Sequence, residues 1–145
     1  MKEERIKRYY DKLEYLNQTI KNLNRWTKGI NIKEFINNLE LQKQYGIYHA
    51  FQISIEIITD LVAMIVRDLK LIPKDDYSNF NILKNKKVIP NDLVAKIGEA
   101  NGLRNRIIHN YNGLDNKIAY ESLINQLKVL ENFEELVKKW LKENY

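Results

Sequence analysis

The sequence predicts a single all-α domain, an up-and-down bundle of about four long helices with shorter helices between them. Apolar residues recur at helical spacing in several long segments, and no segment alternates apolar and polar residues as a half-buried strand does. Two prolines and five glycines interrupt the chain only rarely. The 145 residues fit one domain, residues 1–145, which is long enough to fold without a disulfide or a structural metal.

The first long helix is predicted over about residues 3–27. Its apolar residues are separated by steps of three and four and form one stripe: Ile6, Tyr9, Leu13, Leu16, Ile20 and Leu23. Gly29 and Asn31 interrupt this pattern, and Asn31 is a suitable cap for a short second helix. The apolar residues of that second helix are Ile32, Phe35, Ile36 and Leu39.

The third helix is predicted over about residues 47–71, before Pro73. Its segment Ile47–Val66 is apolar and long enough to span a membrane. The segment also contains polar residues that are costly in lipid, namely His49, Gln52, Glu56 and Asp60. The N-terminal residues begin with charges and lack the apolar stretch of a signal peptide. We therefore expect a cytoplasmic protein without membrane association.

A looser segment and two more long helices complete the predicted fold. Residues 73–91 contain a short helix around Phe80–Leu83, and Asn91 caps a helix that ends near residue 110. A turn follows, and Asp115 caps the last helix. The apolar stripe of the last helix comprises Ile118, Leu123, Leu127, Leu130, Phe133, Leu136, Val137, Trp140 and Leu141.

Composition excludes several kinds of site. The absence of cysteine rules out a disulfide, a thiol nucleophile and a cysteine-rich zinc site. The two histidines, His49 and His109, lie far apart in the sequence, and we expect neither a metal nor a cofactor. The net charge of +5 permits contact with phosphate groups but does not require it.

Arg104 is the most informative polar residue because it lies within the apolar face of its helix. On a helical wheel, Leu93 and Ile108 fall within about 40° of it. A guanidinium there must be paired or must open onto a pocket or interface, since burying it alone is costly. Glu56 and Asp60 of the third helix are candidate partners. Two interpretations stay open: an ion pair that ties two helices together, or an anion site in which that pair holds the guanidinium.

Two further patterns concern the same pair of helices. The polar residues of the third helix fall within an arc of about 100°, which is either its solvent edge or the wall of a cleft or subunit interface. These residues are His49, Gln52, Glu56, Thr59, Asp60 and Arg67. In the helix predicted over about residues 91–110, Gly98 and Gly102 each cost about 1 kcal/mol relative to alanine. We expect them to permit the approach of another backbone or to mark a bend.

The segment Leu103–Tyr111 reads Arg-x4-His-x-Tyr, with Asn105 directly after the arginine. This pattern resembles the signature of HEPN domains, and more narrowly that of the HepT toxin family, whose motif ends in His-x-Tyr. The segment His49–Asp60 is similar to the central helix of that family, and Val88–Leu93 resembles the stretch leading into its motif helix. The resemblance covers about residues 45–125 well and the outer helices only by pattern.

The resemblance implies a metal-independent endoribonuclease that acts as a toxin, a homodimer that cleaves RNA in a cleft faced by both motifs. It implies Arg104 and His109 as catalytic residues. It also implies a partner, a minimal nucleotidyltransferase antitoxin that inhibits the toxin by adding AMP to Tyr111. Three residues are expected to support the catalytic pair: Asn105, Glu56 and Asp60.

These residue types suit metal-free cleavage of RNA. Histidine serves as base or acid near neutral pH, and arginine stabilises the charge that develops on the phosphate. An alternative stays open, since binding a phosphate requires the same residues as cleaving at it. That alternative is a non-catalytic HEPN module that binds a nucleotide or serves as partner subunit of a minimal nucleotidyltransferase. A purely structural helical dimer, joined through the Arg104 pair, is a third interpretation.

Overall fold

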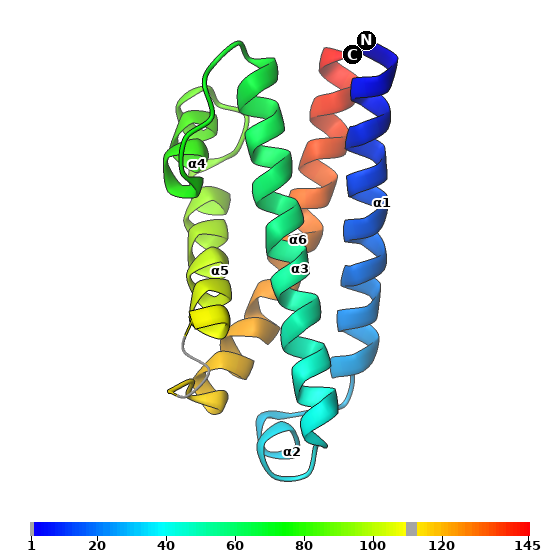
Figure 1. Cartoon of the computed structure of the whole chain (residues 1–145), viewed down its shortest axis with the longest axis vertical. Helices are drawn as coiled ribbons and strands as arrows, with labels where there is room; N and C mark the ends of the chain where they lie inside the picture. The colour runs from blue at the N-terminus through cyan, green and yellow to red at the C-terminus, as the bar shows by residue number, and fades with distance from the viewer. Residues whose placement is uncertain (1, 110–112) are drawn as a thin grey trace.

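The computed structural model describes residues 2–109 and 113–145, and within them the chain forms helices and no strand. The helices are α1 (Lys2–Thr27), α2 (Ile32–Asn37), α3 (Leu41–Asp68), α4 (Asp76–Asn85), α5 (Asn91–His109) and α6 (Asn116–Asn144). The long helices α1, α3, α5 and α6 run up and down, with α2 and α4 at opposite ends of the bundle (Figure 1). The predicted fold class is confirmed.

Helix α3 is the central element. It packs against α1, α4 and α5, while α6 packs against α1, α2 and α5. The N- and C-termini lie side by side at one end of the bundle, and α5 ends near the other (Figure 1). The largest fully buried side chains come from every helix except α5 and form one core: Tyr9, Tyr120, Phe35, Phe51, Phe80, Phe133, Leu13, Leu16, Leu23, Ile47, Ile55 and Ile58.

By length and composition, α3 could cross a membrane, and it is the one such helix among the residues that the structure describes. Most of its apolar stretch is buried inside the bundle, against α1, α4 and α5. Its hydropathy is therefore that of a central core helix, as its embedded polar residues predict.

The bounds of α3 differ from the prediction at both ends. The helix begins at Leu41 rather than near residue 47, because Gly46 is accommodated within it and the next residues, Ile47 and Tyr48, are buried. The packing of these side chains offsets the cost of about 1 kcal/mol that a helical glycine carries. At the other end, Lys70 adopts a φ of 65° and closes the helix early, at Asp68.

The predicted caps are partly confirmed. Asn31 and Asp115 each accept a hydrogen bond from the backbone amide three residues later, at 2.8 and 3.1 Å. Asn91 is instead the first residue of α5 and not its cap. The short helix expected around Phe80–Leu83 is the longer α4, which Asp75 caps. The sequence pattern missed its first turn, where the residues are polar.

Asp68 joins three segments at the end of the bundle that carries the termini. It accepts hydrogen bonds from Tyr9 Oη at 2.6 Å, Arg5 Nε at 3.1 Å and Tyr145 Oη at 2.9 Å. Burial by itself raises the pKa of Asp68, but these hydrogen bonds outweigh it, and the pKa lies below its ordinary value. The cluster therefore fastens α1 and the end of α6 to α3.

Candidate functional site

Helix α5 places Arg104 against α3. Its Nη2 donates to Glu56 Oε1 at 3.5 Å, and its Nη1 donates to the neighbouring Asn105 Oδ1 at 3.0 Å. The side chain is 21% exposed, and its Nε is buried without a partner among the described residues. A guanidinium has five N–H donors, so these two bonds hold the group and leave other donors for a ligand.

The Arg104–Glu56 pair is a poor candidate for a structural tie. Its N–O distance is long, and Glu56 is 40% exposed. A pair that is open to solvent contributes about 0–1 kcal/mol to stability. These values weaken the interpretation in which Arg104 forms a buried ion pair that ties the two helices together. A guanidinium positioned by Glu56 and Asn105 and still reachable from solvent fits the anion-site interpretation better.

Glu56 is itself held in place. Gln52, one turn earlier on α3, donates from Nε2 to the same carboxylate oxygen at 3.1 Å. The hydrogen bonds thus run from Gln52 through Glu56 and Arg104 to Asn105 and cross from α3 to α5. This arrangement restricts the rotamers of the arginine before any ligand binds.

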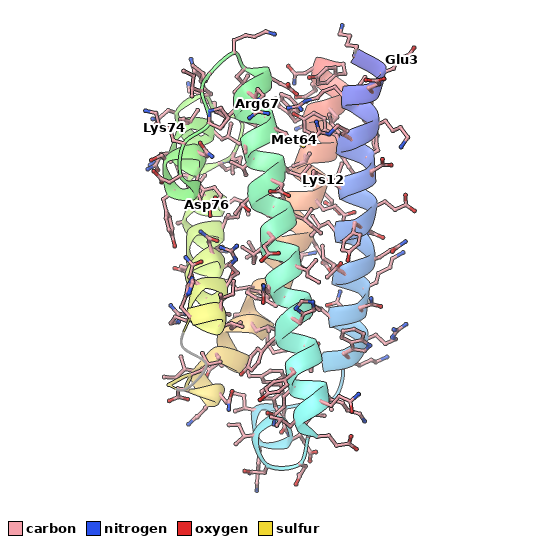
Figure 2. All side chains as sticks on the ribbon, in the orientation of Figure 1. Glu3, Lys12, Met64, Arg67, Lys74 and Asp76 are labelled. Atoms are coloured by element: carbon pink, nitrogen blue, oxygen red, sulfur yellow. The ribbon has the colours of Figure 1, made fainter. Side chains whose placement is uncertain are left out.

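The structure brings Glu56, but not Asp60, to Arg104. Asp60 forms its ion pair with Lys12 of α1, at 3.1 Å, and its side chain is 60% exposed. Figure 2 shows Lys12 between α1 and α3, where it reaches the other side of α3. A sequence pattern that places the two carboxylates one turn apart does not tell which neighbouring helix each one faces.

The polar stripe of α3 follows the accessible side of that helix. His49, Asp60 and Arg67 are exposed, whereas Gln52, Glu56 and Thr59 are half-buried. The stripe is therefore open to solvent in one chain, which is compatible with a solvent edge and with a cleft wall completed by another molecule.

A hollow of about 370 Å³ lies beside the stripe, between the first half of α3, the end of α5 and the start of α6. Tyr48 in its wall donates from Oη to Asn116 Oδ1 at 2.7 Å. Burial, with the nearby charge of Asp115, raises the pKa of Tyr48 above its ordinary value. The lining residues are Leu41, Gln44, Tyr45, Tyr48, His49, Gln52, Ile107, Leu114 and Asn116. Sequence reasoning missed this hollow, although the spacing of Tyr45, His49 and Gln52 places them on one helical face.

His109 is the last residue of α5, and its side chain is exposed. Its side chain forms no hydrogen bond with another residue among 2–109 and 113–145. Five positions along an α-helix correspond to about 140°, so His109 and Arg104 leave α5 in different directions. Tyr111, the expected AMP acceptor, lies outside the described residues.

Gly98 and Gly102 face a side chain of α4 and not another backbone. The ring of Tyr77 crosses α5 there, and a Cβ added at either glycine would meet Tyr77 at 3.7 Å. This is an ordinary van der Waals distance. The close backbone approach expected from the sequence is therefore absent within the described part of the chain.

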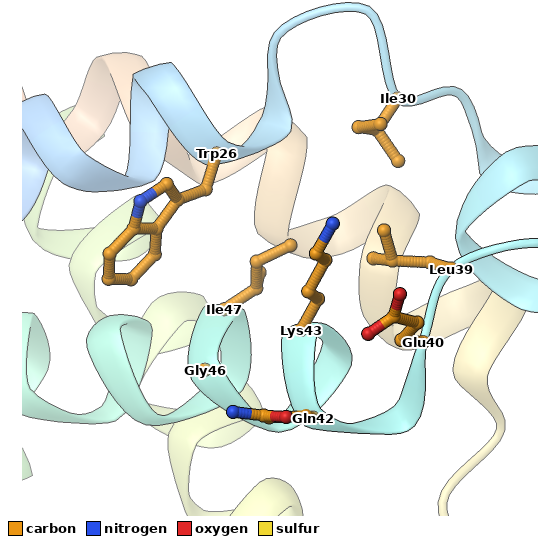
Figure 3. A pocket seen from close by; sticks show the side chains of 8 residues that line it. All are labelled: Trp26, Ile30, Leu39, Glu40, Gln42, Lys43, Gly46 and Ile47. Atoms are coloured by element: carbon orange, nitrogen blue, oxygen red, sulfur yellow. The ribbon is translucent and has the colours of Figure 1, made fainter.

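A second hollow, of about 470 Å³, lies between the end of α1 and the start of α3 (Figure 3). Trp26, Ile30 and Leu39 give it an apolar wall, and Lys43 points its ammonium group toward that wall. It contains neither histidine nor any residue of the Arg-x4-His-x-Tyr motif. We assign it no catalytic role.

Comparison with known proteins connects this geometry to a family. A family model described as "Ribonuclease HepT-like" matches residues 16–137. A protein of Archaeoglobus fulgidus named "Putative RNase" is 30% identical over 139 residues, which cover 93% of this chain and 97% of the relative. Another Archaeoglobus fulgidus protein of the same name is 33% identical over 111 residues, covering 77% of this chain and 76% of the relative.

Solved structures share the fold. One is a tri-AMPylated Shewanella oneidensis HEPN toxin in complex with an MNT antitoxin, with a TM-score of 0.80 and 21% identity. It covers 90% of this chain and 96% of that one. A cytosolic Bacillus subtilis protein of unknown function, YutE, has a TM-score of 0.67 and 14% identity over 88% of this chain and 89% of its own.

Proposed function

The chain belongs to the HepT-like ribonuclease family, and from this premise we propose that it is a metal-independent endoribonuclease, the toxin of a toxin–antitoxin pair. Its substrate is RNA, and its active form is a homodimer. Its partner is a minimal nucleotidyltransferase antitoxin that inhibits it by adding AMP to Tyr111. The toxin–antitoxin assembly of the Shewanella oneidensis neighbour supports this choice of partner.

One observation carries the proposal: Arg104 is held by two hydrogen bonds on a mostly apolar helix face, yet remains reachable from solvent. A buried guanidinium that served only to join α3 and α5 would need short contacts and further hydrogen bonds, because only these offset its desolvation. One that binds a phosphate must keep donors free for its oxygens, as Arg104 does.

Cleavage without a metal uses the 2′-hydroxyl of the RNA as the nucleophile. Its oxygen attacks the adjacent phosphorus, the bond to the 5′-oxygen breaks, and the products carry a 2′,3′-cyclic phosphate and a 5′-hydroxyl. A base removes the proton of the 2′-hydroxyl, and an acid protonates the leaving oxygen. We assign both roles to His109 and the stabilisation of the negatively charged phosphorane to Arg104.

One chain supplies a single motif histidine, whereas the reaction uses a base and an acid. A two-fold symmetric dimer brings two copies of His109 to one cleft, so that one accepts a proton while the other donates one. The different directions of Arg104 and His109 on α5 favour such sharing, in which each phosphate contacts both chains. Asn105 and Glu56 are positioning residues that act through Arg104.

Addition of AMP to Tyr111 gives a direct route to inhibition. The tyrosine follows His109 by two residues, so a nucleotide attached there brings bulk and negative charge to the position where the RNA phosphate binds. Like charges repel, and the substrate is excluded.

The test of this proposal is the Arg104→Ala variant. We expect RNA cleavage in excess EDTA to fall by about 10²–10³-fold, the typical cost of removing one group that stabilises a transition-state anion, and growth arrest to be lost. Arg25→Ala is the matched control. Arg25 is exposed at the end of α1, and its substitution removes the same charge far from Arg104 in the sequence. If Arg104→Ala, folded and dimeric, cleaves purified RNA at the wild-type rate, the assignment is contradicted.

A further inference from the structure

A basic hollow lies at the end of the bundle opposite to the end of α5 that carries His109. It has a volume of about 570 Å³ and is enclosed by the end of α3, the loop between α4 and α5, and the last turns of α6. Its lining residues are Leu69, Lys84, Lys86, Lys87, Val88, Ile89, Pro90, Asn91, Leu136, Lys139, Trp140, Glu143 and Asn144. The hollow is thus independent of the catalytic motif.

The charge in this hollow is one-sided. Lys84, Lys86 and Lys87 form no ion pair within the described ranges, while Lys139 has only a 4.0 Å contact with Glu143, the single carboxylate of the lining. Such unpaired ammonium groups repel one another, and an anionic ligand relieves that repulsion.

Lys87 also carries a backbone conformation that lysine rarely adopts. Its φ is 58°, in the left-handed region that follows the end of α4, where glycine is usual. A non-glycine residue there costs about 1–2 kcal/mol, so the fold alone favours a glycine at this position. Because Lys87 also lines the hollow, the substitution of glycine there removes one of its charges without a cost to the backbone.

Shape and an aromatic wall favour a nucleic-acid strand over a flat anionic surface such as a membrane. The lysines come from separate segments and surround a concave site, and the half-buried indole of Trp140 lies in the wall among apolar side chains. Lysines that follow a phosphate backbone, together with an aromatic ring beside the bases, are the usual elements of sites for single-stranded RNA.

We propose that this hollow is a second RNA-binding site, which holds the phosphate backbone of the substrate away from the cleavage position. The inference rests on the proposed function for the identity of the ligand. Arg104 lies about 20 Å along the axis of α5 from Asn91, which lines the hollow. A single strand that reaches from one site to the other must therefore be several nucleotides long. The enzyme thereby discriminates in favour of long substrates.

The test measures binding of a fluorescently labelled, fully 2′-O-methylated RNA of about 16 nucleotides. This probe lacks the nucleophilic hydroxyl and cannot be cleaved by the proposed chemistry. The full-length variant Lys84→Gln/Lys86→Gln/Lys87→Gln is compared with Lys21→Gln/Lys28→Gln/Lys33→Gln, which removes the same charge from exposed positions on α1 and α2 and the turn between them. We expect the hollow variant to bind the RNA at least about tenfold more weakly than this control. The slope of log affinity against log salt concentration should fall by the equivalent of about two phosphate contacts.

Lys87→Gly gives an independent check of the fold. We expect the Tm to stay the same or rise, because glycine adopts the left-handed conformation without strain. We expect RNA binding to weaken, because one lysine of the hollow is lost. If the hollow variant and the control variant bind the RNA with equal affinity, the inference is overturned. This holds even if the hollow proves to bind an acidic protein instead. Because the probe is uncleavable, the inference survives an absence of nuclease activity. Conversely, if the hollow does not bind RNA, the proposed cleavage by Arg104 and His109 is not contradicted.

Discussion

Arg104 shows which properties of a candidate site residue can be predicted from the sequence and which require the structure. Its position on an apolar helix face was visible in the sequence, and so was Glu56 as a partner. The length and solvent exposure of the contact were not visible, because they depend on the separation of α3 and α5 and on the competing bond to Asn105. The long distance and the exposed carboxylate fit the proposed anion-binding role better than a structural ion pair.

Asp68 shows the opposite case, a residue that the sequence did not single out and that the fold depends on. We predict that Asp68→Asn lowers the free energy of unfolding by about 2–3 kcal/mol at pH 7, since charge-assisted hydrogen bonds from Arg5, Tyr9 and Tyr145 are weakened. Urea unfolding measures this loss. Asp11→Asn, which breaks an exposed pair with Lys7, is the control and should cost less than about 1 kcal/mol.

The same carboxylate predicts a pH dependence. The pKa of Asp68 is lower in the folded chain than in the unfolded chain. Its contribution is therefore fully present above the unfolded value of about 3.9 and is lost as the pH falls through the lower folded value. The stability difference between wild type and Asp68→Asn should shrink below pH of about 4. A difference that stays constant down to acid unfolding would show that the charge of Asp68 is not what stabilises the cluster.

At the scale of elements, helix periodicity predicted most of the bundle. The stripe of α1, most of the stripe of α6 and the caps Asn31 and Asp115 were correct because they depend on local spacing and on backbone amides nearby. Ile118, assigned to the α6 stripe, is instead exposed, because it lies in the first turn of that helix. The start of α3 and the extent of α4 were not, since buried side chains around Gly46 and the tertiary packing of α4 decide them. The ring of Tyr77 over the glycines of α5 likewise depends on how two helices pack.

The glycines of α5 give a prediction at this scale. Gly98→Ala and Gly102→Ala should each raise the free energy of unfolding by about 0.5–1 kcal/mol, because alanine is the better helix former and the added Cβ meets Tyr77 at 3.7 Å. Thermal or urea unfolding of the two variants checks this. Gly29→Ala is a control of opposite sign, since Gly29 has a φ of 74° and an alanine there is strained. A loss of stability in both α5 variants would mean that the helix does not tolerate a side chain on this face.

At the scale of the whole molecule, the two proposed sites lie at different parts of α5. The Arg104 contacts join its second half to α3, whereas the basic hollow borders its first turn. The family was predictable from the motif and the matching neighbouring segments. The basic hollow was not, because only the fold brings Lys139 and Trp140 of α6 beside the lysines of residues 84–87.

The most direct test of the central claim is cleavage of total cellular RNA by the purified protein in excess EDTA, beside His109→Ala. Intact mass first establishes that neither protein carries AMP. We predict that wild type cleaves and that His109→Ala is slower by about 10²–10⁴-fold, the usual contribution of a general acid or base. Intact RNA after long incubation with unmodified wild type, or equal cleavage by both proteins, would contradict the account.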